Sequence, residues 1–132
     1  MRLMHIEHVA LWTNDLEQLK VFYETYFGAR AGEKYVNPHK QFESYFLTFA
    51  SGARLELMRR PDLVERRAQD HTPLAGYTHL AVSVGSKQQV DDLTARLQAA
   101  GCLVVDGPRY TGDGYYESSV LDPDGNRIEI TI

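Results

Sequence analysis

The chain has 132 residues, 43% of them hydrophobic and 24% charged, which suits one globular domain or two small modules sharing a core. A formal net charge of −4 argues against nucleic acid or an anionic membrane as a partner, and no stretch approaches the roughly 20 apolar residues of a membrane span. Cys102 is the single cysteine and the N-terminus lacks a signal peptide's apolar run, so we expect a cytoplasmic protein without disulfides.

The first predicted element is a strand at residues 6–11, and a similar strand is predicted at residues 78–84. His8 begins His-Val-Ala-Leu in the first, and His79 begins His-Leu-Ala-Val in the second, an offset of 79 − 8 = 71. Two copies of one pattern suggest two copies of one structural unit.

A helix is predicted after each of these strands. Each begins with capping-box spacing and ends at a glycine. These positions are Asn14, Glu17 and Gly28 in the first half, and Ser86, Gln89 and Gly101 in the second. The apolar stripes are Leu16, Leu19, Phe22, Tyr23 and Tyr26, then Val90, Leu93, Leu97 and Ala100.

Three short strands are predicted after each helix, because the periodicity changes from helical to alternating. They cover residues 31–36, 45–50 and 54–58 in the first half, and 103–106, 116–121 and 127–132 in the second. We therefore expect an α+β fold of two βαβββ modules, residues 1–59 and 77–132, joined by a polar connector at 60–76. The whole chain, 1–132, is then a single domain.

The last predicted strand carries a carboxylate between two isoleucines. Asp122-Pro123-Asp124-Gly125 suits a type I turn, and Glu129 follows between Ile128 and Ile130. Glu56, between Leu55 and Leu57, repeats this arrangement. Since successive strand side chains point to opposite faces, both glutamates should project away from the buried aliphatic face.

The same alternation sends His8 and His79 to the face opposite the module's helix. If the modules pair about a pseudo-twofold axis, His8, Glu56, His79 and Glu129 converge in a metal-binding cleft. Two imidazoles and two carboxylates suit one divalent ion such as Zn²⁺, Ni²⁺ or Co²⁺, with Mn²⁺ and Fe²⁺ as alternatives. A single His or Glu in a strand is usually a surface residue. The prediction of a metal site therefore rests on the recurrence of both residues at matching positions.

Together these motifs resemble the vicinal oxygen chelate superfamily, which includes glyoxalase I, methylmalonyl-CoA epimerase, extradiol dioxygenases and bleomycin-sequestering proteins. The resemblance rests on His8, on Leu-Glu-Leu around Glu56, on the strand around His79, and on Asp-Pro-Asp-Gly-Asn-Arg-Ile-Glu-Ile around Glu129. The four-residue set is similar to the metal ligands of bacterial glyoxalase I. It leaves two octahedral positions for water or for two substrate oxygens.

The resemblance implies a metal-dependent lyase or isomerase acting on a small 2-oxo or 2-hydroxy carbonyl compound, including a thiol hemithioacetal. The metal acidifies the C–H beside the bound oxygen and stabilises an enediolate, and a carboxylate moves the proton. Glu129 is the first candidate for this base and Glu56 the second. The alternatives are an epimerase, a dioxygenase, or a metal-binding or small-molecule-binding resistance protein without turnover.

Two positions depart from the glutathione-using glyoxalases, which typically have an Arg four residues after the first His and an Asn four after the first Glu. Here these are Trp12 and Arg60. Another anionic tail has candidate partners in Arg54, Arg59, Arg60 and Arg109, although the alternative of a solvated rim is favoured. Four aromatic residues are candidates to line the cleft, although aromatic residues in strands more often belong to the core or an interface: Trp12, Tyr45, Tyr115 and Tyr116.

The expected partners are a small-molecule substrate and a second copy of the chain. Each module leaves one sheet face open, and a chain of this size gains burial by association. The connector is long enough for pairing within a chain or between chains. The resemblance favours exchange in a homodimer, with His8 and Glu56 of one chain meeting His79 and Glu129 of the other.

Overall fold

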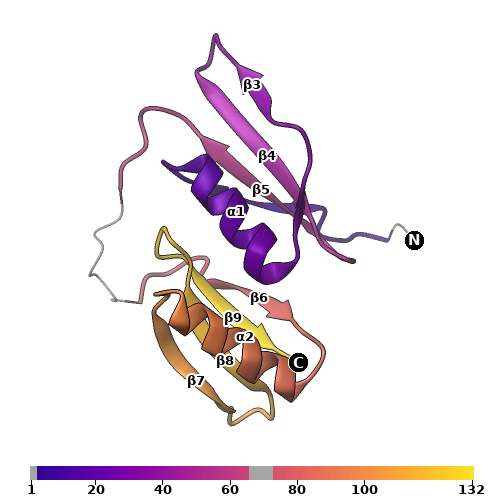
Figure 1. The fold of residues 1–132 in the computed structure, drawn as a ribbon. Helices are drawn as coiled ribbons and strands as arrows, with labels where there is room; N and C mark the ends of the chain where they lie inside the picture. The colour runs from indigo at the N-terminus through magenta and orange to yellow at the C-terminus, as the bar shows by residue number, and fades with distance from the viewer. Residues whose placement is uncertain (1–2, 66–72) are drawn as a thin grey trace. The chain divides into compact units, whose positions relative to one another are not determined.

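The computed structural model describes residues 3–65 and 73–132. The chain divides into two units, Met1–Arg66 and Arg67–Ile132, each with one helix against a mixed sheet (Figure 1). This is the α+β fold of two βαβββ modules that the repeat predicts. The boundary falls inside the predicted connector, of which residues 66–72 lie outside the described residues. Neither helix in the described residues is long and apolar enough to cross a membrane.

The first unit is built around a sheet with strand order β1-β5-β4-β2, in which β3 also pairs with β4. β1 runs parallel to β5, whereas β4 is antiparallel to its three partners. The elements are β1 (His8–Trp12), α1 (Leu16–Phe27), β2 (Arg30–Ala31), β3 (Tyr35–Asn37), β4 (Phe42–Thr48) and β5 (Arg54–Arg59).

The second unit repeats this plan with strand order β6-β9-β8-β7. Its elements are β6 (His79–Ser83), α2 (Lys87–Ala99), β7 (Val104–Tyr110), β8 (Tyr116–Leu121) and β9 (Arg127–Thr131). The parallel pair β6–β9 matches β1–β5 residue for residue: Ala81 lies opposite Glu129, as Ala10 lies opposite Glu56. The internal repeat in the sequence is therefore a structural repeat.

Alternation along the last strand of each unit divides core from open face as predicted. Leu55 and Leu57 are buried, as are Ile128 and Ile130, while the glutamate between each pair is only partly buried. The buried helix residues include Leu16, Leu19, Phe22 and Tyr23 of α1 and Val90, Leu93 and Leu97 of α2, most of the two predicted stripes. Burying an aliphatic side chain contributes about 1.5–3 kcal/mol, so these faces fix the strand register.

The helix ends correct one predicted cap. The N-cap of α1 is Asp15, not Asn14: the Asp15 carboxylate accepts a hydrogen bond of 3.0 Å from the backbone N–H of Gln18. Asp15 and Gln18 have capping-box spacing too, one residue later than the predicted pair. Ser86 is confirmed as the N-cap of α2, and Gly28 ends α1 in the left-handed conformation that favours glycine.

Two strand predictions needed correction. Residues 31–36 do not form one strand. They include the last residue of β2, Ala31, and the first two of β3, and the two strands pair with different parts of β4. Strand β7 continues past Asp106 to Tyr110 through two register irregularities. The strand was predicted to end at residue 106, but the bulged edge strand accommodates Gly107 and Pro108 and continues.

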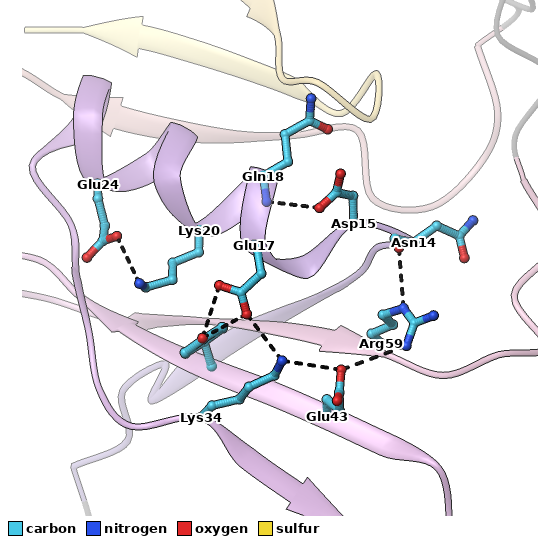
Figure 2. A network of polar contacts seen from close by, with 10 residues as sticks. Asn14, Asp15, Glu17, Gln18, Lys20, Glu24, Lys34, Glu43 and Arg59 are labelled. Atoms are coloured by element: carbon cyan, nitrogen blue, oxygen red, sulfur yellow. Dashed lines mark hydrogen bonds and ion pairs between the residues drawn. The ribbon is translucent and has the colours of Figure 1, made fainter.

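A polar network ties α1 to its sheet (Figure 2). Glu17 on α1 accepts a hydrogen bond of 2.9 Å from the Tyr45 hydroxyl of β4 and pairs with the Lys34 ammonium at 3.2 Å. Lys34 also lies 3.5 Å from Glu43. The hydrogen bond from Tyr45 lowers the pKa of the Glu17 carboxyl, because it stabilises the charged form.

We expect Tyr45→Phe to destabilise the protein by about 1 kcal/mol at pH 7, the usual contribution of one hydrogen bond. A carboxyl whose pKa is lowered by folding adds stability above its ordinary value of 4.5, and this is lost as pH falls through the lowered pKa. The difference from wild type should therefore shrink below pH 4.5. Urea unfolding at pH 7 and in acid checks this, with the exposed Tyr35→Phe as control. An equal loss at both pH values would contradict it.

Candidate metal centre

The first predicted ligand pair forms within unit 1. His8 begins β1 and Glu56 lies on the adjacent parallel strand β5, with both side chains on the face opposite the aliphatic core. The His8 Nε2 and Glu56 Oε1 atoms are 3.7 Å apart. The Glu56 side chain is 14% exposed and that of His8 is 41% exposed, so the carboxylate sits deeper than the imidazole.

The second pair forms in the same way within unit 2. His79 begins β6, Glu129 lies on β9, and the His79 Nε2 atom is 2.6 Å from Glu129 Oε1. The carboxylate is again the less exposed partner, at 19% against 34%. Of the four predicted ligands, the structure thus brings together His8 with Glu56 and His79 with Glu129.

The donor atoms of each pair fit neighbouring positions on a divalent ion. With bonds of about 2.1 Å, two ligands at a right angle lie about 3 Å apart. The observed separations lie on either side of this value, each within 1 Å of it. Among residues 3–65 and 73–132, no group of three His, Cys, Asp or Glu side chains gathers to hold a metal. Each unit supplies two of the four predicted ligands.

Glu7, which the sequence analysis did not single out, contacts the far side of the His8 ring. Its Oε2 atom lies 2.5 Å from His8 Nδ1, and its Oε1 accepts a hydrogen bond of 2.7 Å from Arg54 Nε. The hydrogen bond with His8 lowers the pKa of Glu7. Glu7 lies within the strand predicted at residues 6–11, where alternation places it on the face opposite His8, whereas in the structure it precedes β1, which begins at His8.

Glu117 is a second acidic residue that the sequence analysis missed. It lies on β8, where its neighbour two positions on, Ser119, is paired with Glu129. Burial raises the pKa of Glu117, and the negative charge of Glu129 raises it further. Strand alternation could have identified Glu117 from the sequence, since residues 117 and 119 of one strand point to the same face. This face of unit 2 therefore holds two carboxylates and an imidazole.

The four arginines considered as an anion-binding rim already have acidic partners within the chain. Bidentate contacts join Arg60 to Asp62 and Arg109 to Asp106. Arg54 pairs with Glu7, and Arg59 lies 3.8 Å from Glu43. These ion pairs agree with the favoured interpretation of a solvated rim.

The aromatic candidates divide between core and surface. Tyr45 and Tyr116 are buried, and their hydroxyls bond to carboxylates of the helices, Glu17 and Asp91. Tyr115 is exposed. Trp12 is 46% exposed, and the Arg60 guanidinium lies 5.7 Å from its ring centre. The two positions that depart from glutathione-using glyoxalases therefore contact each other.

A model of the Glyoxalase/Bleomycin resistance protein/Dioxygenase superfamily matches residues 5–130. The uncharacterised protein PA2024 of Pseudomonas aeruginosa is 31% identical over 137 residues, an alignment that covers 96% of this chain and 86% of that protein.

Solved structures share the fold. SMU.1112c superposes with a TM-score of 0.81 at 24% identity, covering 99% of this chain and all of the other. The trypanothione-dependent glyoxalase I of Leishmania major superposes with a TM-score of 0.76 at 22% identity, covering 98% of this chain and 86% of that one.

Proposed function

The chain belongs to the glyoxalase/bleomycin resistance protein/dioxygenase superfamily, and on this premise we propose that it is a metal-dependent, glyoxalase I-like lyase or isomerase. Its proposed substrate is a small 2-oxo or 2-hydroxy carbonyl compound, including a thiol hemithioacetal. Its proposed place of action is the cytoplasm. Members of this superfamily commonly bind a divalent metal.

The observation that carries the proposal is a His–Glu pair at equivalent positions in the two units. An imidazole and a carboxylate lie at the same strand register in both units, on the sheet face opposite the aliphatic core. A single pair is a common surface contact, whereas two pairs provide the four nitrogen and oxygen ligands that suit Zn²⁺, Ni²⁺ or Co²⁺. We propose that His8, Glu56, His79 and Glu129 hold one such ion, with Mn²⁺ or Fe²⁺ as alternatives.

A bound divalent ion would supply Lewis acidity toward the substrate's oxygens. The chain's own residues then handle the proton. Glu129 is the proposed base that removes a proton from carbon and returns it to the neighbouring carbon, and Glu56 is the second candidate. Both carboxylates are mostly buried beside more exposed imidazoles, which limits their contact with water.

The non-reacting part of the substrate is proposed to be uncharged. Recognition of an anionic tail such as that of glutathione needs a free cation, and the four candidate arginines are engaged with Glu7, Glu43, Asp62 and Asp106. Trp12 and Arg60 contact each other at the positions where glutathione users typically carry Arg and Asn. The trypanothione-dependent Leishmania enzyme illustrates that a glyoxalase I with this fold can use another thiol.

The direct test is turnover by metal-free protein after separate addition of Ni²⁺, Co²⁺, Mn²⁺ and Zn²⁺. We expect at least one ion to restore isomerisation of a methylglyoxal hemithioacetal. Strict dependence on Fe²⁺ with consumption of O₂ would replace this function with oxygenation. Metal binding without turnover of any 2-oxo or 2-hydroxy carbonyl compound would favour a binding protein.

A comparison of two thiols tests the proposed substrate class. We expect kcat/KM for the hemithioacetal of methylglyoxal with uncharged 2-mercaptoethanol to lie within about threefold of the value with glutathione. The four candidate arginines are paired with carboxylates, so they would not supply the glutathione adduct with a charged contact worth about 1.5–3 kcal/mol. An enzyme adapted to glutathione's carboxylates would prefer that adduct by about tenfold or more. Such a preference would contradict the proposed uncharged substrate class.

A further inference from the structure

The two histidines differ in what their rings contact. His8 has a carboxylate on each side: Glu7 Oε2 lies 2.5 Å from Nδ1 and Glu56 Oε1 lies 3.7 Å from Nε2. In the second unit the position before the histidine is Thr78, which carries no charge. The contact with Glu7 is therefore specific to the first half of the repeat.

Glu7 is held in place by contacts on both its backbone and its side chain. Its carbonyl oxygen accepts a hydrogen bond of 2.8 Å from the backbone N–H of Arg54, which extends the β1–β5 ladder by one step. Its carboxylate accepts from the Arg54 side chain, whose guanidinium stacks 4.1 Å from the centre of the Phe46 ring. The His8 ring packs against the same phenylalanine, at a centroid distance of 5.3 Å. Arg54 and His8 therefore pack on the same Phe46 ring, and the Glu7 carboxylate contacts both of them.

The direction of the hydrogen bond follows from the chemistry of the carboxylate. An ionised carboxylate only accepts, so Nδ1 of His8 must carry the proton that it donates to Glu7. In the neutral ring the lone pair then lies on Nε2, the nitrogen that faces Glu56. The 3.7 Å separation there is longer than a hydrogen bond, as expected for two acceptors that face each other.

We propose that Glu7 is a positioning residue that holds His8 with its proton on Nδ1 and so presets Nε2 as a metal ligand. The inference rests on the proposed function, because it assumes that His8 is a ligand. A carboxylate behind a ligating imidazole fixes its orientation and raises its basicity, and its loss typically weakens metal binding by 10- to 100-fold. Unit 1 would then contribute the more preorganised half of the ligand set.

The test combines Glu7→Ala, the isosteric Glu7→Gln and the control Asp62→Ala. The control also removes one exposed acidic partner of an arginine, so it makes the same change in net charge away from the imidazole. Competition titration of metal-free protein with Ni²⁺ alone should show about 10- to 100-fold weaker binding for Glu7→Ala, a smaller loss for Glu7→Gln, and no change for Asp62→Ala. Thermal unfolding confirms that each variant is folded.

A second readout needs no metal. Long-range ¹H–¹⁵N spectra of metal-free protein at pH 8.5, with His8 assigned from the His8→Ala variant, should show the proton on Nδ1 in the wild type and not in Glu7→Ala. A wild-type proton on Nε2, or equal Ni²⁺ affinity in Glu7→Ala and Asp62→Ala, would overturn the positioning role. If Glu7 fixes the tautomer but wild-type protein binds neither Ni²⁺ nor Co²⁺, the proposed function fails, and with it the preset ligand.

Discussion

Replacing His79 by alanine is expected to weaken metal binding by roughly 100-fold, so that metal content falls below the wild-type value of about one divalent ion per set of four ligands. Four-ligand structural Zn²⁺ sites in zinc-finger peptides bind with about 10–16 kcal/mol, and an equal share for one ligand is about 3 kcal/mol. Elemental analysis after gel filtration measures this directly. Activity should fall with metal content.

The matched control is His39→Ala, which removes a histidine from the turn between β3 and β4 and should leave metal content unchanged. Equal metal content in wild type and His79→Ala would show that the ion, if present, is bound elsewhere. It would remove His79 from the ligand set and leave its 2.6 Å contact with Glu129 as a surface pair.

The architecture was largely predictable because the sequence contains an internal repeat, so each module is predicted from its own copy of the pattern. Two pairs of similar patterns predicted the two modules: His-Val-Ala-Leu with His-Leu-Ala-Val, and Leu-Glu-Leu with Ile-Glu-Ile. Alternation placed Glu56 and Glu129 opposite buried aliphatic neighbours, as observed. Both signals are local and act over a few residues. The less accurate predictions were boundaries, such as the cap at Asn14, where the next residue satisfies the same spacing.

The surroundings of the site were less predictable because they depend on contacts between residues far apart in sequence. Arg54 and Glu7 are 47 positions apart and meet because β1 pairs in parallel with β5. The sequence alone does not show which acidic residue an arginine contacts. In the fold, Arg54 is paired with the carboxylate of Glu7. The ion pairs of the four arginines therefore could not be predicted from the sequence, whereas the two His–Glu pairs follow from strand alternation and register.

The two ligand pairs can form one metal site only if two units pair. We propose that the paired units come from different chains of a homodimer. Each unit leaves the sheet face that bears its His–Glu pair free of its own helix, so a matching face must come from the same chain or from a second copy. In the exchanged form, His8 and Glu56 of one chain act with His79 and Glu129 of the other.

Mixing His8→Ala chains with Glu129→Ala chains is expected to restore metal binding that neither variant shows alone. In an exchanged heterodimer one site carries both substitutions and the other carries none. Random mixing makes half of the dimers heterodimers, so metal content should recover to about a quarter of the wild-type value, with activity in proportion. The variants are unfolded together and refolded, and differently tagged chains allow the heterodimer to be isolated.

Mixing His8→Ala with Glu56→Ala chains is the matched control: both substitutions then damage the same unit, so each site of an exchanged heterodimer lacks one ligand and no recovery is expected. If tagged heterodimers of the first mixture form without regaining metal, each site is built within one chain and the exchanged arrangement is wrong.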